Sequence, residues 1–450
     1  MCGIAGFCNF KEDFEENTDY WNFRLEKMRA VLAHRGNDAR GRYLKKHIGL
    51  SHSRLAIRDI LCGDQPMTRT HNGYDYTICY NGEIYNTDEL IPELSENGFV
   101  CSTTSDTEVI LYAYIHWGAD FVNRLNGIFA FAIWDAAKSR LLLYRDRVGV
   151  KPLFYAIRGD SLVFGSEPKA CFAHPAVKPE LDKQGLQELL AIGPAHTSGL
   201  SLFKDLFEVL PGHFMIYSQN GLHDETYWEL TSREHTESYR DTVAHTRFLV
   251  EDAIKRQMVS DVPVCTFLSG GIDSSIVTAI AANYMNTRGK TLNTFSFDFK
   301  DNDRYFKANA FQPERDLPYV NRMLEEYETA HSYLECDENS LFKALFAAVD
   351  AKDMPGMTDV DSSLLYFCSL VSRKNKVALT GECADEIFGG YPWFYRKELL
   401  ERYGFPWSSD VAPRLALLRD DVGLELDLSG YQAFRYEESR SKAPLLYGEA

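Results

Sequence analysis

Met1-Cys2-Gly3-Ile4-Ala5-Gly6-Phe7 opens the chain and decides how its first half is interpreted. Cys2 is small enough to permit removal of Met1, which would place a thiol and a free α-amine on one residue. An α-amine has a pKa of about 7.7–8.0, so much of it can accept the thiol proton at neutral pH. A threonine next to its own terminal amine works in the same way. The alternative is a terminal strand in which Cys2 is a small buried apolar residue.

The bulk composition sets the limits within which the motifs are interpreted. The chain has 450 residues, enough for two or three domains. Its formal net charge of −17 argues against a nonspecific nucleic-acid binder. Its ten cysteines include no C-x-x-C pair, which favours reduced thiols and a cytoplasmic location. The first thirty residues are rich in charge, and no apolar run approaches the ~20 residues of a membrane span, so neither a secretory signal nor a membrane segment is expected.

Two segments of the first half carry basic residues of interest. Apolar spacing predicts a helix over 20–33, followed by a glycine-flanked loop in which His34 is equally compatible with a structural and a site-lining role. Residues 51–59 alternate like a half-buried strand. Arg54 would be a costly inward charge there unless it met an anion, and a guanidinium suits bidentate capture of a carboxylate. The alternative is an arginine on the surface of a strand.

Two further segments offer hydrogen-bonding groups. Asn81-Gly82 lies between apolar runs, which is a strong hairpin signal, but it also offers the amide and backbone N–H donors that an oxyanion hole requires. Ser105 and Asp106 precede an apolar helical pattern and are most simply N-caps. An aspartate in that position can also face an ammonium group.

The motifs of residues 1–215 follow one another in a recognisable order. They are Cys2-Gly3-Ile4, His34-Arg35-Gly36, Arg54-Leu55, Asn81-Gly82-Glu83-Ile84-Tyr85-Asn86, Ser105-Asp106-Thr107-Glu108, Leu125-Asn126-Gly127-Ile128-Phe129-Ala130-Phe131-Ala132 and Arg145-Asp146-Arg147-Val148-Gly149-Val150-Lys151-Pro152-Leu153-Phe154-Tyr155. This order resembles the class II (N-terminal nucleophile) glutamine amidotransferases. The last two motifs, with Phe164-Gly165-Ser166-Glu167-Pro168-Lys169-Ala170, resemble the asparagine synthetase branch. Asn37 stands where that family commonly has proline, and since asparagine is also a turn former we expect little effect.

The resemblance implies a role for each matching residue. Cys2 would attack the side-chain amide of glutamine, and Asn81 and Gly82 would stabilise the oxyanion. Arg54 would hold the substrate α-carboxylate, and Glu83 and Asp106 its α-amine. The full glutamine-binding set implied is Arg54, Leu55, Ala56, Ile57, Arg58, Asn81, Gly82, Glu83 and Asp106.

The second half contains a strand, a glycine-rich loop and a helix start in succession. Residues 262–268 predict a short buried strand, and Ser269-Gly270-Gly271-Ile272-Asp273-Ser274-Ser275 follows it. Backbone N–H groups and the helix dipole make such a loop a cradle for phosphate. A generic strand-to-helix turn would also contain two glycines. The complete motif resembles the pyrophosphate loop of the ATP-pyrophosphatase superfamily, which implies binding of ATP by Leu268, Ser269, Gly270, Gly271, Asp273, Ser274, Ser275, Phe297, Thr380 and Gly381, with Phe297 beside adenine.

Carboxylates follow a later buried strand, predicted at 377–380. Glu382 and Asp385 are three residues apart and would share a face of a helical turn. Beside a phosphate loop, paired carboxylates suggest Mg²⁺ bound jointly with pyrophosphate oxygens, for which Asp273 and Asp385 are the predicted ligands. Capping of a helix N-terminus is the alternative for these acids. Glu382, Asp385 and Asp361 are the residues predicted to lie near an aspartate substrate or the metal.

These observations predict an α/β protein of two domains. The resemblance implies a four-layer α/β/β/α glutaminase domain over residues 1–228, and residues 229–450 are expected to form a doubly wound parallel α/β domain of the ATP-pyrophosphatase type. The resemblance implies asparagine synthesis from aspartate, glutamine and ATP through an acyl-adenylate, with ammonia passing through an apolar tunnel between the domains. Amidation of another carboxylic acid and a regulatory protein that retains only glutaminase are the alternatives. The partners expected are small molecules, with no nucleic acid or membrane.

Two expectations concern the extent of the protein. Asparagine synthetases usually continue through further helices that carry a basic motif, and this chain ends at Ala450, so the resemblance implies that the usual C-terminal part is missing. A homodimer is compatible with the resemblance, although the sequence does not decide it.

Overall fold

The computed structural model of the protein describes residues 1–308, 314–408 and 410–442. The chain forms two compact units. The first contains Met1–Ser232 together with Leu418–Leu428, and the second contains Arg233–Leu417 and the chain from Ser429 onward.

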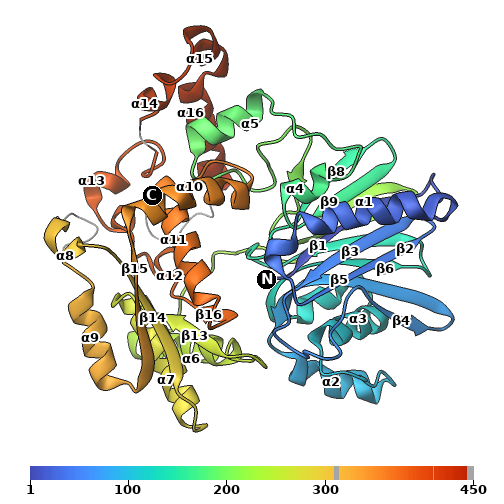
Figure 1. Ribbon diagram of the computed structural model, residues 1–450, viewed down its shortest axis with the longest axis horizontal. Helices are drawn as coiled ribbons and strands as arrows, with labels where there is room; N and C mark the ends of the chain where they lie inside the picture. Colours follow the sequence, from blue (N-terminus) through green and yellow to red (C-terminus); the bar gives the residue numbers. More distant parts are fainter. Residues whose placement is uncertain (309–313, 409, 443–450) are drawn as a thin grey trace. The chain divides into compact units, whose positions relative to one another are not determined.

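The first unit is built on two six-stranded antiparallel sheets (Figure 1). In spatial order, one sheet contains β10 (Phe207–Glu208), β8 (Phe154–Arg158), β9 (Ser161–Gly165), β1 (Gly3–Asn9), β3 (Ile48–Arg54) and β2 (Ala39–Lys45). The other contains β12 (Gly221–Thr226), β11 (His213–Ser218), β7 (Arg140–Arg145), β6 (Gly127–Asp135), β5 (Tyr74–Ile84) and β4 (Met67–His71). Its helices include α1 (Thr18–Ala30), α2 (Thr87–Glu96), α3 (Asp106–Trp117), α4 (Pro168–Phe172), α5 (Lys183–Gln187) and α15 (Asp420–Leu426).

Alternation of side chains along the strands produces four layers. On β1, Ile4 and Cys8 point into the core between the two sheets, while Ala5 and Phe7 pack against α1 and α4. On β5, Ile78, Tyr80 and Ile84 pack against α2 and α3. The first sheet is therefore covered by α1 and α4 and the second by α2 and α3, which is the four-layer α/β/β/α arrangement predicted from the sequence.

The strand β5 decides between the two interpretations of Asn81-Gly82. It runs without a turn from Tyr74 to Ile84, and Asn81 and Gly82 pair with Ala130 and Phe129 of β6. The hairpin interpretation is therefore wrong, because pairing along β6 overrides the local turn preference. The glycine meets a different requirement, since a Cβ at position 82 would lie 2.3 Å from the carbonyl oxygen of Ile128.

The second unit is built on a four-stranded parallel sheet in the order β15-β14-β13-β16. The strands are β13 (Val264–Phe267), β14 (Leu292–Phe299), β15 (Thr329–Cys336) and β16 (Val377–Leu379). The chain extends from β13 through β14 to β15 and then returns to the other side of β13 to form β16. This reversal is the topological switch point of a doubly wound fold, where ligands bind at the carboxyl ends of the strands. The predicted fold class is confirmed.

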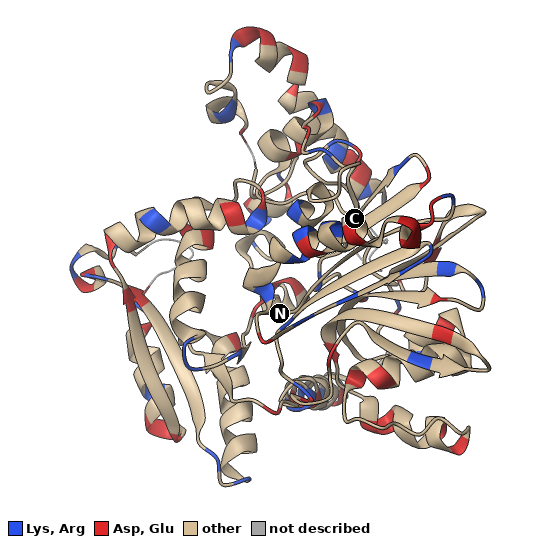
Figure 2. Cartoon of the chain, turned by 45° about the vertical axis from the view of Figure 1, so that its right-hand side comes forward, with Lys and Arg blue, Asp and Glu red and all other residues tan. Residues whose placement is uncertain are grey.

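Helices cover both faces of this sheet. Val264 packs toward α7 (Ile272–Asn286), on which α6 (Tyr239–Arg256) packs in turn, and its neighbour Cys265 packs toward α11 (Thr358–Val371). The other helices are α8 (Asn302–Tyr305), α9 (Leu317–Glu326), α10 (Glu338–Lys352), α12 (Ala384–Phe388), α13 (Lys397–Leu400), α14 (Ala412–Leu415) and α16 (Leu428–Lys442). Among the helices of the described residues, none is both long and apolar enough to cross a membrane. Acidic and basic residues occur on helices and strands of both units (Figure 2).

Candidate active sites

The candidate nucleophile Cys2 immediately precedes β1. Its Sγ accepts a hydrogen bond from the backbone N–H of Leu55 (3.3 Å), the residue after the end of β3. Arg35 fixes the backbone on the other side, since its Nε donates to the carbonyl oxygen of Cys2 (2.9 Å). Burial raises the pKa of the Cys2 thiol above its usual value, and the Leu55 N–H opposes that rise. Deprotonation therefore requires a base close by.

The terminal amine lies in surroundings that keep it neutral. Burial lowers the pKa of the Met1 amine to about 5, and the cationic side chains of Arg35 and Lys151 contribute to the lowering. Lys151 is itself buried, which lowers its pKa to about 8, and its Nζ lies 2.6 Å from the Met1 sulfur. An amine at this end of β1 is thus available as a proton acceptor at neutral pH.

Asn81 supplies an unpaired donor beside this terminus. Cys79, on the same face of β5 as Asn81, packs into the core between the two sheets, so Asn81 and Glu83 also point toward the sheet that contains β1. Asn81 is only 1% exposed, and its Nδ2 has no hydrogen-bond partner. Leaving a buried amide donor unpaired costs about 1–3 kcal/mol. Such a donor is what a developing oxyanion would use.

Glu83 supplies an unpaired acceptor on the same face. Its Oε2 is buried without a hydrogen-bond partner, and it lies close enough to Cys2 to influence the pKa of that thiol. Burial, and then the nearby carboxylate of Asp106, raise the pKa of Glu83 to about 8. Asp106 is held by the hydroxyl of Tyr80 (2.9 Å) and the N–H of Ile84 (3.1 Å), and burial raises its pKa as well. Two buried carboxylates with raised pKa values form a place for a cationic group.

Both terminal nitrogens of the Arg54 guanidinium group bind residues of the loop that follows Arg54. Its Nη1 donates to Ile60 O (3.1 Å) and Asp64 Oδ1 (3.0 Å), and its Nη2 donates to Arg58 O (3.3 Å) and Asp59 O (2.5 Å). Bidentate capture of a carboxylate, predicted from the sequence, does not fit this arrangement. In the described chain only Nε lacks a hydrogen-bond partner, so Arg54 shapes the loop and keeps one donor free.

The rest of this loop lies beside Cys2. The strand predicted over 51–59 ends earlier, because β3 stops at Arg54. The loop that follows it contains Leu55, Ala56, Ile57 and Arg58. The N–H of Ala56 donates to Asp38 Oδ2 (2.8 Å). Arg58 donates to Ile84 O (2.8 Å) and to Thr87 Oγ1 (3.2 Å), which ties the loop to the end of β5.

His34 belongs to a positioning network rather than to the nucleophile itself. Glu167 accepts from Arg35 Nη1 (2.7 Å) and lies 3.0 Å from His34 Nε2. Although burial raises the pKa of Glu167, the hydrogen bonds from His34 and Arg35 outweigh that effect and lower it to about 2. In the sequence, Arg35, Glu167 and Lys151 stand out only as parts of motifs. The charge of Lys151 between Val150 and Pro152-Leu153-Phe154 was the signal available, whereas Arg35 lies in a polar turn that gives no such signal.

The second site lies at the switch point of the parallel sheet. The loop after β13 is closed by Ser274, whose Oγ lies 3.0 Å from Ser269 Oγ and accepts from the N–H of Ser269 (3.2 Å). Gly270 has a φ of +85°, which favours glycine, and Gly271 caps the start of α7. Leu268 and Phe295 join the loop to the sheet through a 2.8 Å backbone bond. Ser275 lies in the first turn of α7.

The loop after β16 packs directly on this glycine-rich loop. A Cβ at Gly381 would lie 2.7 Å from Cβ of Asp273 and 2.9 Å from the N of Ser274, so only glycine permits this approach. The same approach brings Asp273 near Asp385, and burial followed by that second carboxylate raises the pKa of Asp273. A bound cation would relieve this repulsion. Within the described ranges, no group of three or more His, Cys, Asp or Glu residues could hold a metal, so this pair would need phosphate oxygens to complete a Mg²⁺ site.

Other predicted residues of the second half have different surroundings. Phe297 packs on Phe367, with ring centroids 5.0 Å apart. Asp361 lies in the first turn of α11, where it pairs with Lys352 (2.8 Å) and accepts from the N–H of Met357 (2.8 Å). Its carboxylate is therefore occupied, which the sequence could not indicate.

The predicted helical turn shared by Glu382 and Asp385 is wrong. The helix α12 begins only at Ala384, and Cys383 is left-handed with a φ of +69°. Glu382 is exposed, and its N–H lies 3.4 Å from Thr380 Oγ1. A cavity of about 1550 Å³ extends from Asp273, Thr380, Gly381, Glu382 and Asp385 along α6 and α7.

Comparisons with known proteins bear on both sites. The glutamine amidotransferase domain family matches residues 1–228, and the asparagine synthase family matches residues 245–450. The chain is 47% identical over all of its 450 residues to asparagine synthetase [glutamine-hydrolyzing] 3 of Bacillus subtilis (strain 168), of which it covers 72%. The chain belongs to the glutamine-hydrolysing asparagine synthetase family.

Two further relatives show the breadth of this family. Asparagine synthetase [glutamine-hydrolyzing] 1 of Bacillus subtilis (strain 168) is 32% identical, over 89% of this chain and 60% of the relative. Amidase chyE of Penicillium rubens is 31% identical, over 92% of this chain and 62% of the relative. The chain thus spans less than two thirds of the length of each of these two relatives.

Proposed function

We propose that this protein makes L-asparagine from L-aspartate, taking nitrogen from glutamine and driving the reaction with ATP. The observation that carries the proposal is the pair of unsatisfied buried groups, Asn81 Nδ2 and Glu83 Oε2, on the strand face that looks toward the Cys2 terminus. One is a donor suited to an oxyanion and the other an acceptor suited to an ammonium group. Family membership across the whole chain supports the same activity.

The first reaction is hydrolysis of the glutamine side-chain amide. After removal of Met1, the Cys2 amine takes the thiol proton and the thiolate attacks the amide carbon. The oxygen of the tetrahedral intermediate accepts hydrogen bonds from Asn81 Nδ2 and the N–H of Gly82. When the carbon–nitrogen bond breaks, the ammonium form of the amine returns the proton to the leaving ammonia. Water then hydrolyses the thioester, which releases glutamate and restores the thiol.

The substrate is oriented by the two charged groups on its α-carbon. Its α-ammonium group meets Glu83 and Asp106, and it therefore stabilises the ionised forms of carboxyls whose pKa values are raised in the free protein. Its α-carboxylate meets Arg54 Nε and the chain at Leu55, Ala56, Ile57 and Arg58. In this arrangement Nη1 and Nη2 of Arg54 do not contact the substrate, and they contribute to the pocket by holding its loop in place.

The second reaction takes place at the switch point. The loop of Leu268, Ser269, Gly270, Gly271, Asp273, Ser274 and Ser275 holds the phosphates of ATP, Phe297 borders adenine, and Thr380 and Gly381 complete the nucleotide site. Asp273 and Asp385 would hold Mg²⁺, and that ion would supply positive charge to stabilise the diphosphate leaving group. The aspartate β-carboxylate attacks the α-phosphorus, diphosphate leaves, and ammonia then displaces AMP from the acyl carbon. Glu382 lies beside that acceptor, whereas the pairing of Asp361 with Lys352 gives it a supporting position.

Several finer assignments are part of the proposal. The functional division falls between residues 228 and 229, and the protein acts in the cytoplasm on small molecules rather than on nucleic acid. A homodimer is compatible with the family. The cofactors are ATP, which the family uses, and Mg²⁺.

The deciding experiment follows diphosphate release with ATP, Mg²⁺ and glutamine, with and without aspartate, while asparagine is measured by mass spectrometry. We expect diphosphate to depend on aspartate and to match asparagine in amount. Glutamate production without diphosphate would overturn the second half of the proposal and leave a glutaminase. A protein of full activity that retained Met1 would overturn the role of the Cys2 amine.

Amidation of a different carboxylic acid is the second candidate. The relative named amidase chyE is about as similar to this chain as asparagine synthetase 1 is, at 31% against 32% identity. Diphosphate release that requires an acid other than aspartate would favour this candidate.

A further inference from the structure

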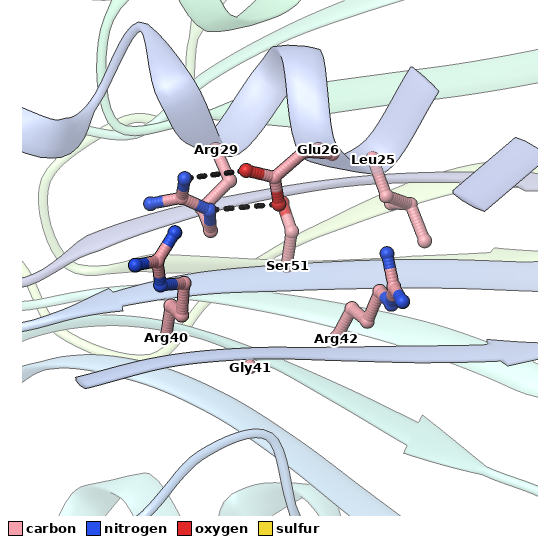
Figure 3. A pocket seen from close by; sticks show the side chains of 7 residues that line it. All are labelled: Leu25, Glu26, Arg29, Arg40, Gly41, Arg42 and Ser51. Atoms are coloured by element: carbon pink, nitrogen blue, oxygen red, sulfur yellow. Dashed lines mark hydrogen bonds and ion pairs between the residues drawn. The ribbon is translucent and has the colours of Figure 1, made fainter. Parts of the chain in front are cut away.

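An arginine-lined pocket lies on the outer face of the first unit, beneath α1 (Figure 3). It has a volume of about 300 Å³ and is lined by Leu25, Glu26, Arg29, Arg40, Gly41, Arg42 and Ser51. This volume is at the lower end of the range for small-ligand sites. Neither candidate active site uses any of these residues.

Two elements bring the charged side chains together. Arg40 and Arg42 alternate on the edge strand β2, so both project from one face of the sheet, with Cα atoms about 7 Å apart. Figure 3 shows their guanidinium groups directed toward α1, where Arg29 and Glu26 lie. The helix is held in place, because Ser53 of β3 donates to the carbonyl oxygen of Arg29 (3.3 Å).

The charges in this pocket do not balance. Arg29 is buried and already paired with Glu26 through two bonds of 3.0 and 2.5 Å. Hydrogen bonding from Arg29 lowers the pKa of Glu26, and Arg40 and Arg42 are near enough to lower it further. Throughout the described residues, the guanidinium groups of Arg40 and Arg42 have neither a hydrogen bond nor an ion pair. One carboxylate thus faces three guanidinium groups, in a chain whose net charge is −17.

We propose that this pocket binds a small, multiply charged phosphate anion, with inorganic diphosphate as the simplest form. Guanidinium groups bind phosphate oxygens in a bidentate manner, and two unpaired ones offer ten N–H donors. Arg40 and Arg42 grip the anion from β2, while the Arg29–Glu26 pair forms the opposite wall. Diphosphate is also the product proposed for the second half, and this last connection alone rests on the proposed function.

The rival explanation is that charged residues merely protect an edge strand from pairing with another chain. The same hairpin provides a matched comparison, since Lys45 and Lys46 are exposed, lie outside the pocket and form only long ion pairs of 4.0 Å. The double variants R40Q/R42Q and K45Q/K46Q remove equal charge from neighbouring positions of one hairpin. A general electrostatic effect would weaken anion binding equally in both.

Calorimetric titration of the full chain with inorganic diphosphate, in buffer without magnesium, tests the proposal. Diphosphate bound at the glycine-rich loop contributes equally in both double variants, so the difference between them isolates the pocket. We expect R40Q/R42Q to lose this binding component, weakened about tenfold or more, and K45Q/K46Q to keep it. Equal weakening in both, or no change in R40Q/R42Q, would overturn the proposal.

A chemical footprint locates the ligand without any substitution. Phenylglyoxal modifies accessible arginines, and we expect diphosphate to protect Arg40 and Arg42 but not the exposed Arg240 of α6. Parallel experiments with AMP and sulfate distinguish a phosphate ester and a nonspecific dianion from diphosphate. Protection by sulfate at the same concentration, or no protection of Arg40 and Arg42 by any phosphate compound, would contradict the assignment. None of these measurements requires synthetase activity, so failure here and failure of the proposed function are distinguishable.

Discussion

The two candidate active sites differ in where their polar groups lie before a substrate arrives. In the first unit, Asn81 and Glu83 are fixed by a strand that continues on both sides of them, and each has a buried atom without a partner. In the second unit, Glu382 is exposed and lies on the connection after a three-residue strand, and Asp385 is partly exposed and lies in the first turn of the short helix α12. The folding of an antiparallel sheet fixes the polar groups of the first site. Two loops that meet at the edge of the parallel sheet position those of the second.

This difference has an energetic origin. A buried group without a hydrogen bond destabilises the folded state by about 1–3 kcal/mol, and a substrate that supplies the missing partner recovers that free energy. Exposed carboxylates destabilise the free protein little, because water solvates them. Their electrostatic attraction for a cation becomes strong only when nucleotide and metal exclude that water. Substitutions in the first site should therefore impair catalysis directly, whereas those in the second should alter the dependence on ATP and Mg²⁺.

Replacing the nucleophile should have the largest effect. We expect Cys2→Ser to lower glutaminase kcat on the order of 10⁴-fold, because no other thiol occupies the start of β1. Glutamate release measures this loss. Synthesis from added ammonium salt should continue, since ammonia from solution bypasses the first site.

The matched control for Cys2 is Cys62→Ala, which removes an exposed free thiol elsewhere in the same unit. A loss of glutaminase activity in this control similar to that in Cys2→Ser would show that the effect is not specific to Cys2. Loss of the ammonia-dependent reaction in Cys2→Ser would contradict the separation of the two sites.

Removal of the unpaired donor should come next in size. Asn81→Ala should lower glutaminase kcat about 10²- to 10³-fold, with a smaller change in KM, because the donor acts on charge that develops in the transition state. Asn81→Asp should be at least as severe, since it places an acceptor where the oxyanion forms. Asn220→Ala, in the exposed turn between β11 and β12, is the control. A loss in Asn81→Ala that appeared mainly in KM would point to substrate binding instead.

The sequence predicted more of the fold than of the side-chain geometry. The family resemblance implied the four layers of the first domain, whereas the buried strands and the glycine-rich loop were enough to predict the parallel sheet of the second, because parallel strands leave local patterns. The strand β15 was missed since it mixes polar and apolar residues and most of its side chains are only partly buried or exposed. Contacts between distant segments were beyond local patterns. Lys151 reaches Met1 across 150 positions of the sequence, which only the assembled sheets determine. The partners of Arg54 are near in sequence, but they are mostly main-chain carbonyls of its own loop, which residue types do not indicate.

The carboxylate pair of the second site should show an intermediate effect. Asp385→Asn should lower aspartate-dependent diphosphate release about 10- to 100-fold and raise the Mg²⁺ concentration needed for half-maximal rate. The repulsion that raises the pKa of Asp273 disappears with the second charge. Glu386→Gln on the same short helix is the control, since glutamine can still accept the hydrogen bond of Tyr391. An unchanged Mg²⁺ dependence in Asp385→Asn would remove this residue from the metal site.

The smallest effect concerns pH and the buried acceptor. Burial raises the pKa of Glu83 from 4.5 to about 8, so below pH 8 the free protein holds it as the neutral acid. Binding the α-ammonium group of glutamine requires the ionised form. In a Cys2→Ala background, which removes the thiol, the affinity for glutamine should therefore rise about fivefold as the pH increases from 7 to 8. Isothermal titration with glutamine at each pH measures this slope.

The charge change itself is controlled by comparing Glu83→Gln with Glu96→Gln, an exposed carboxylate of α2. Glu83→Gln should bind glutamine weakly and almost independently of pH, while Glu96→Gln keeps the slope. Stability should change in the opposite direction to affinity. Because the folded pKa lies above the unfolded one, the unfolded chain releases the Glu83 proton first, and stability falls from pH 4.5 to 8 and then levels off. In Glu83→Gln the free energy of unfolding should fall less over this pH range than in Glu96→Gln. Identical pH profiles of unfolding in these two variants would mean that the Glu83 carboxylate is exposed to solvent and is not part of a site formed before the substrate binds.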